Sequence, residues 1–376
     1  GAAGAAIGGF GGGGAGGLGG SAAASCLDPS TFAASFAIAD STFCAVAVYT
    51  APESIGFQAP TWGSHGGPLV AQKGAVFGGG GSTGAAGAPG YGVILERWTP
   101  PAGTTGTMTV QTTTLASALP SGAFLGAQAV DLPFFGWTAI TWINAFPNTS
   151  GAFEMISNGV TVYAVNGAFG VAAVPAAGSL GRLVYSGLSP LGTSTAGANG
   201  LYEADACSSP MPALGSGTGC SPSAAVATWG ENSGPVAADS SGDVFAVMTF
   251  LSTSTQEARG FSAAAIARGA GPTAGVPVFT LAGFPGSLAA LSPGAATPGV
   301  VVFQPFNSTT FAALDVVEQK FTTSGGTLAL MGTASTLLTV PSGQTQGLSF
   351  LVDGSERLWV AISGASSTTY VVLARH

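Results

Sequence analysis

Charge is scarce in this sequence. Lys and Arg together number 8 and Asp and Glu 16, so charged residues make up 6% of the chain and the net charge is -8. A protein with so few cations cannot neutralise many phosphates, which excludes nucleic acid as a partner. It also lacks the basic clusters that bind anionic membranes. Glycine, serine, threonine and the side-chain amides must therefore supply most of the hydrated surface.

Cysteine and histidine are also few. The 4 cysteines fall in two close pairs, Cys26 with Cys44 and Cys207 with Cys220, and there are only 2 histidines. Neither cysteine spacing is typical of a zinc site. Four cysteines allow three connectivities, and only the local one closes two short loops. We therefore expect the disulfides Cys26–Cys44 and Cys207–Cys220, which indicate an oxidising compartment.

Long apolar runs are absent as well. No run reaches the roughly 18 residues that a membrane-spanning helix needs. The N-terminus has no basic segment followed by an apolar core, so we expect that a signal peptide was removed ahead of Gly1. With the cysteines, this predicts a secreted or cell-surface protein without a membrane span.

What the chain does contain begins with a Gly/Ala-rich arm, residues 1–25. Of its first 20 residues, 12 are Gly and 5 are Ala, and Ile7, Phe10 and Leu18 are its large apolar side chains. Such a composition usually makes a flexible linker. Glycine loses much backbone entropy on ordering, so an ordered arm needs a partner surface for its backbone groups. We predict that the arm packs against another copy of the protein, with these side chains as anchors. The alternative is that it folds back on its own chain.

Residues 26–376 form a series of short apolar, β-branched runs separated by clusters of Gly, Pro, Ser, Thr and Asn, which are strand and turn signals. The strongest runs recur at intervals of 45 to 60 residues, and further strands lie between them. Four strands per unit at this period predict an all-β fold, a seven-bladed β-propeller. An irregular pair of β-sandwiches is the alternative. The centres of the seven runs are Ala45, Ile94, Ile140, Tyr185, Phe245, Phe303 and Trp359.

Several of these runs follow a tight turn with Asp, Asn or Gly, as in PVAADSSGDVFAV, where Asp239 and Gly242 form an Asp-x-x-Gly pattern. The pattern resembles the hairpin of secreted bacterial β-propeller repeats over about residues 30–376. This resemblance implies a propeller fold and brings no catalytic residues. The last unit ends at Ala374 in its third strand. Since propellers commonly close by pairing the two ends of the chain, we expect SAAASCLD, ahead of residue 30, to supply the missing outer strand.

Candidate catalytic patterns have plainer structural interpretations. A Gly-x-Ser-x-Gly match at residues 80–84 is followed by GAAGAPG, which cannot form the helix that a nucleophile elbow needs. His65 lies in a glycine-rich loop without a predictable acid or nucleophile beside it. Asp239 and Asp243 flank a turn, where Asp bonds its own backbone. A calcium ion there would need a fuller ligand loop.

Two surface features remain. The 6 tryptophans would serve either as a sugar-binding platform or as filling between blades. Asn148 and Asn307 begin N-glycosylation sequons in predicted polar loops, which makes them candidate glycosylation sites.

These patterns leave two classes of function. The first is a non-enzymatic extracellular structural protein, without cofactor or metal, that self-assembles into a filament, sheath or surface layer through its N-terminal arm. The second is a secreted propeller that binds glycans or other extracellular ligands through loops at one end of its central channel. The absence of a catalytic constellation and the Gly/Ala-rich arm favour the first.

Overall fold

The computed structural model describes the residues of 26 strands, together with the connecting residues 239–243, 262–267, 270–275, 292 and 325–326. This part of the chain is all-β, as the sequence predicts. Among the residues that the structure describes, no helix is long and apolar enough to cross a membrane.

The described strands form six sheets, and neighbouring strands within each sheet are antiparallel. The first three sheets, each given from its inner strand outward, are β3 (Pro60–Trp62), β4 (Leu69–Val76), β5 (Tyr91–Thr99) and β6 (Thr109–Thr114); β7 (Phe124–Leu132), β8 (Trp137–Asn144), β9 (Ser150–Ser157) and β10 (Val160–Asn166); and β11 (Ala168–Val174), β12 (Gly181–Gly187), β13 (Asn199–Cys207) and β15 (Ala224–Trp229), with β14 (Ala213–Leu214) also on β13.

The other three sheets complete the ring. They are β16 (Ser233–Ala238), β17 (Val244–Phe250), β18 (Thr255–Phe261) and β19 (Val276–Ala282); β20 (Leu288–Leu291), β21 (Val300–Phe303), β22 (Ala313–Ser324) and β23 (Thr327–Pro341), followed by β1 (Ala37–Ile38); and β24 (Thr345–Val352), β25 (Leu358–Gly364), β26 (Thr369–Arg375) and β2 (Phe43–Thr50).

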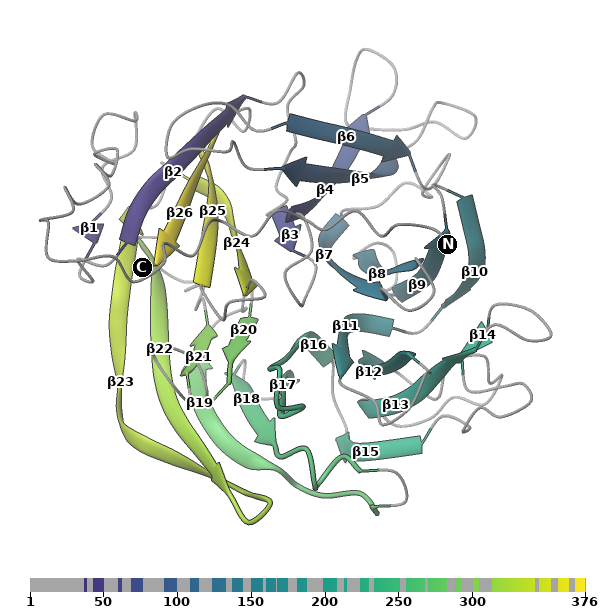
Figure 1. The fold of residues 1–376 in the computed structure, drawn as a ribbon, viewed down its shortest axis with the longest axis vertical. Coiled ribbons are helices and arrows are strands. Elements are labelled where there is room, and N and C mark those ends of the chain that lie inside the picture. The colour runs from purple at the N-terminus through teal and green to yellow at the C-terminus, as the bar shows by residue number, and fades with distance from the viewer. Residues whose placement is uncertain are drawn as a thin grey trace, which may run out of the picture.

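The six sheets stand around a common centre (Figure 1). Their inner strands contact one another in the order β3, β7, β11, β16, β20 and β24, and β24 returns to β3. Each sheet therefore faces a neighbour on both sides, with one edge at the centre and one at the rim. This is a propeller-type arrangement.

The prediction of seven blades is not confirmed, because the described strands form six sheets. The first and last of the seven anchor runs belong to one sheet: β2, which carries Ala45, pairs with β26 from Phe43↔Arg375 to Thr50↔Thr369. An N-terminal strand thus completes the last sheet, as expected for closure. It is β2 rather than the SAAASCLD run, and that run lies outside the described residues.

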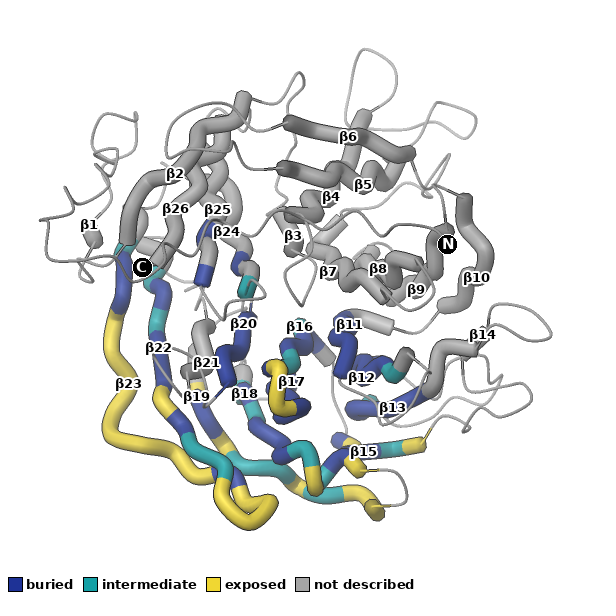
Figure 2. The backbone as a smooth tube through the Cα atoms, in the orientation of Figure 1, coloured by how far each residue is buried: buried dark blue, intermediate teal, exposed yellow. Residues whose placement is uncertain are grey.

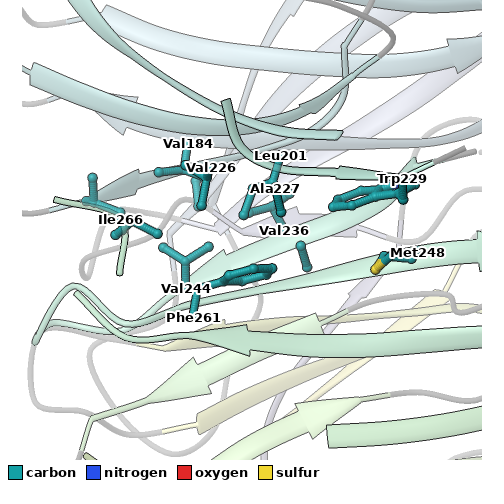
Figure 3. Packing of buried hydrophobic residues seen from close by; sticks show 13 residues of the cluster. Val184, Leu201, Val226, Ala227, Trp229, Val236, Val244, Met248, Phe261 and Ile266 are labelled. Carbon is teal, nitrogen blue, oxygen red and sulfur yellow. The ribbon is translucent and has the colours of Figure 1, made fainter. Parts of the chain in front are cut away.

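Strand β17 shows why the anchor runs are apolar at nearly every position. Its residues Val244, Ala246 and Met248 pack in a cluster shared with β12, β13 and β15 (Figure 3). Phe245 and Val247, which alternate with them, pack in a second cluster with β20, β22 and β23. Successive side chains of a strand point to opposite faces, so a strand buried on both faces needs an unbroken apolar run.

The predicted Asp-x-x-Gly turn between β16 and β17 is confirmed. The Oδ1 atom of Asp239 accepts hydrogen bonds from the amides of Ser241 and Asp243, both at 2.9 Å. The amide of Gly242 donates to the Asp239 carbonyl at 3.1 Å, and Gly242 has a φ of 88°. An aspartate at the first position and a glycine at the left-handed position are what such a turn requires.

Candidate interaction surface

The β22–β23 hairpin has the longest strands in the described chain and runs along the outside of the ring (Figure 1). β22 has 12 residues and β23 has 15. The strands are joined by Gly325 and Gly326, with φ values of 58° and 79°. Two left-handed residues make a type I′ turn, whose twist matches that of the flanking strands.

Polar contacts hold the end of this hairpin against the neighbouring sheet. The buried carboxylate of Asp243 accepts from the Ala263 amide at 2.7 Å and from the Thr323 hydroxyl at 2.5 Å. The Ser262 hydroxyl donates to the Gly326 carbonyl at 2.5 Å. Hydrogen bonds to a charged group contribute about 1.5–3 kcal/mol each. We call this set of contacts the hairpin latch.

An aromatic pair lies beside the latch. Phe245 and Phe321 are both buried, with ring centroids 4.8 Å apart and ring planes inclined by 59°. Phe245 lies two residues after Asp243, and Phe321 lies two residues before Thr323. The polar and aromatic contacts therefore join the same two segments. Gly260 leaves room for the ring, since a Cβ there would lie 2.7 Å from Phe245 Cε1. The hairpin is thus fixed by packing as well as by hydrogen bonds.

The outer side of β23 is exposed. Every residue from 329 to 336 is exposed (Figure 2), and Leu330 and Met331 are the exposed large hydrophobic residues of the described chain, at 38% and 51%. Of the described strands, β1 alone pairs with this side, through Ala37↔Thr339 and Ile38↔Leu338. We call residues 329–336 the free edge.

The free edge is uncharged and bulged. No charged residue lies between Lys320 and Asp353. Opposite Gln319, residues 332–334 have no cross-strand partner, because the register passes from Lys320↔Met331 to Glu318↔Ser335. The buried Gln319 amide fills the gap, donating to the carbonyls of Lys320 at 2.9 Å and Met331 at 3.1 Å. The sequence predicts further strands between the anchor runs, but its uncharged stretch does not show that this edge is exposed.

Two acidic positions considered at the sequence level have structural roles. Asp239 holds the β16–β17 turn, and Asp243 holds the hairpin latch. Within the described ranges, no group of three or more His, Cys, Asp or Glu side chains is placed to bind a metal ion.

Another acidic residue, Glu203, is paired with a cation. Glu203 on β13 forms a largely buried ion pair with Arg182 on β12, and the Arg182 guanidinium also donates to the Ile266 carbonyl. Trp229 lies in the core between two sheets (Figure 3). It therefore fills space between sheets rather than forming a sugar platform.

Other predicted residues fall elsewhere. Cys44 lies in β2 and Cys207 at the end of β13, but their predicted partners are not among the described residues. Both disulfides therefore remain predictions. Also outside the described residues are Cys26, Cys220, Ile7, Phe10, Leu18, His65, Ser82, Asn148 and Asn307.

Burial raises the pKa of the Tyr202 phenol above its ordinary value. The folded state then holds the phenol proton more tightly than the unfolded state. The contribution of the protonated Tyr202 side chain to the free energy of unfolding is therefore present below about pH 10 and is lost as the pH rises further. We expect the free energy of unfolding to fall as the pH rises above about 10, and Tyr202→Phe to flatten that fall. Urea titrations across this range check it, and an unchanged slope in the variant would contradict it.

Comparison with known proteins identifies no family. The chain matches no protein-family model, and no curated protein matches it. Among solved structures, it is similar to apo prolyl oligopeptidase B from Galerina marginata at 10% identity and a TM-score of 0.36, over 83% of this chain and 39% of that one. It is also similar to a GH43_1 enzyme from Xanthomonas citri complexed with xylose, at 10% identity and a TM-score of 0.35, over 91% of this chain and 89% of that one.

The chain thus spans about two fifths of the length of the prolyl oligopeptidase chain. Similarities this weak carry no argument about activity. No family is shown for the resemblance to secreted bacterial β-propeller repeats. The described part of the chain has an all-β, propeller-type arrangement.

Proposed function

We propose that this chain is a non-enzymatic structural protein of the cell exterior, which self-assembles into a filament, sheath or surface layer through its N-terminal arm. The scarcity of charge and the two cysteine pairs support an extracellular setting. Three described carboxylates support a structural role, because Asp239, Asp243 and Glu203 bond to turns and neighbouring strands.

The observation that carries this proposal is the position of β1. This strand, the described element nearest the arm, consists of Ala37 and Ile38 and adds to the outer edge of a sheet built from residues 288–341. Residues 37–38 therefore already contact a sheet by strand addition. Main-chain hydrogen bonds give affinity in that mode of binding, and it needs few large side chains. A Gly/Ala-rich arm is suited to it.

An arm that binds another copy makes a head-to-tail contact. Such contacts generate a ring if the rotation between copies closes, and an open filament if it does not. Each copy would carry one arm and one acceptor. A growing polymer would therefore have an unused arm at one end and an unused acceptor at the other.

Deleting residues 1–25 tests the proposal. We expect the shortened protein to stay soluble and keep its β-sheet circular dichroism, since all described strands lie after residue 36, while polymers disappear from negative-stain images and sedimentation velocity. A full-length control with Ile7, Phe10 and Leu18 replaced by alanine keeps the arm's length but loses its anchors, and should polymerise more weakly. Unchanged polymers after the deletion would contradict the proposal, and monomers that bind immobilised glycans would favour the alternative function.

A further inference from the structure

We infer that the free edge of β23, residues 329–336, is the acceptor to which the N-terminal arm of a second copy adds as a further strand. This inference rests on the proposed function and specifies which surface the arm binds. The sequence alone pointed to the last sheet as the place for an added strand. In the structure β2 occupies that place, pairing with β26 over the whole strand.

The backbone of β23 offers hydrogen-bonding groups to an added strand. In an antiparallel ladder, bonded and non-bonded residue pairs alternate, so every second residue directs its N–H and C=O away from the partner strand. β22 covers one side of β23, and β1 covers the other only at Leu338 and Thr339. Beyond those residues, no described strand pairs with the outer side, and the side chains there are exposed.

Two other described rim strands are less suitable acceptors. β19 has an exposed proline, Pro277, which lacks the N–H that an added strand would bind. β15 is only 6 residues long. β23 is more than twice that length and has no proline before Pro341.

The arm and the free edge match in chemistry. Residues 1–25 contain no charged side chain, and neither does β23, so strand addition desolvates no side-chain charge. Gly and Ala permit close approach of the arm backbone to the edge. Leu330 and Met331 are consecutive in the strand, so their exposed side chains point to opposite faces and offer apolar contacts on both. Ile7, Phe10 and Leu18 are the arm's matching side chains.

The register of β1 favours an arm supplied by a second copy over the arm of the same chain as the strand that adds to the free edge. β1 runs antiparallel to β23, with Ala37 opposite Thr339 and Ile38 opposite Leu338. Continued toward the N-terminus, the direction of β1 therefore runs past Thr339 toward Pro341. That direction leads away from the free edge of its own β23. The same edge on another molecule has no such directional constraint.

The bulge at residues 332–334 favours an arm over a second β23. Bulges protect natural edge strands because two bulged, twisted edges cannot pair flat against each other. The Gln319 amide holds this bulge in place. A glycine-rich segment can change direction where the ladder is interrupted, because glycine adopts backbone conformations closed to other residues. The edge therefore discriminates against self-pairing while accepting a pliable strand.

The acceptor is tested with Leu330→Lys, which places a charge on the free edge, a recognised protection against strand addition. Met331→Lys is the second variant, at a position that is 51% exposed. Thr228→Lys is the matched control, because residue 228 is exposed on the rim strand β15, which belongs to a different sheet from β23. Thermal melts of all three confirm folding. We expect either edge variant to raise the concentration needed for polymerisation more than about tenfold, and the control to leave it unchanged.

Mixing separates this inference from the proposed function. Protein lacking residues 1–25 keeps the acceptor but has no arm, and Leu330→Lys keeps the arm but has a blocked acceptor. Each alone should stay monomeric, and the equimolar mixture should form dimers that stop growing. Hydrogen exchange should slow at residues 329–336 of the shortened partner only. Edge variants that polymerise like the control would overturn the acceptor while leaving arm-driven assembly intact, whereas polymers formed without the arm would overturn both.

Discussion

Replacing Phe245 by alanine is expected to lower the free energy of unfolding by about 3–5 kcal/mol. Phe245 is fully buried, packs against Phe321 at 4.8 Å between centroids, and belongs to the cluster that joins two sheets. The removed ring leaves a cavity that strands held by their ladders on both sides cannot close. Urea unfolding followed by tryptophan fluorescence measures the change.

The matched control is Phe245→Leu, which keeps most of the apolar volume and loses the aromatic contact. We expect it to cost about 1–2 kcal/mol, the range for shape changes in a packed core. If the alanine variant lost no more stability than the leucine variant, the two sheets would not depend on this ring for their contact.

Replacing Asp243 by alanine is expected to cost about 3 kcal/mol, because two hydrogen bonds to a buried carboxylate are lost and the Ala263 amide keeps no acceptor. Asp243→Asn should cost about 1 kcal/mol. Its carbonyl oxygen still accepts from Ala263, and the Thr323 hydroxyl can reverse its bond to accept from the new amide. Chemical denaturation of both variants gives the comparison.

A double-mutant cycle with Thr323→Val isolates the hydrogen bond between Thr323 and Asp243 in the hairpin latch. We expect a coupling of about 1 kcal/mol or more between residues 243 and 323, since they share a hydrogen bond. Additive effects would mean that the latch is not a coupled unit. Hydrogen exchange near Gly326 should also quicken in Asp243→Ala, because the end of the hairpin loses one of its attachments.

Much of the strand content was predictable because burial on both faces leaves a clear trace in the sequence. The run around Phe245 is apolar at successive positions, and the structure shows these positions facing two different clusters. The Asp239 turn was predictable for a local reason, since its hydrogen bonds span 2 and 4 residues. Signals of this kind do not depend on how the sheets are arranged.

The number of sheets was not predictable from the runs alone. Ala45 and Trp359 each mark a strong strand, and periodicity gives each strand its own unit. Only the pairing of β2 with β26 shows that both strands belong to one sheet. The apolar character of a run indicates that its strand is buried, but it does not indicate with which other strand it pairs.

The hairpin latch and the free edge were also beyond sequence reasoning. Asp243 and Thr323 are 80 residues apart in sequence, and Ser262 and Gly326 are 64 apart. Exposure of Leu330 depends on which side of β23 faces the rim. The local composition reveals that the segment is uncharged, which is necessary for an acceptor edge but does not locate one.

The pairing of β2 with β26 sets the order of events when the chain is synthesised. Residues 43–50 emerge long before residues 369–375, with which they pair, so the sheets cannot close into a ring until residue 375 has left the ribosome. Bringing such distant segments together is slow, because long loops must close before their contacts form. Residues 327–341 are also made late. A nascent chain therefore exposes its arm long before its acceptor edge has been synthesised. A polymer can then grow only by adding molecules whose acceptor edge has formed.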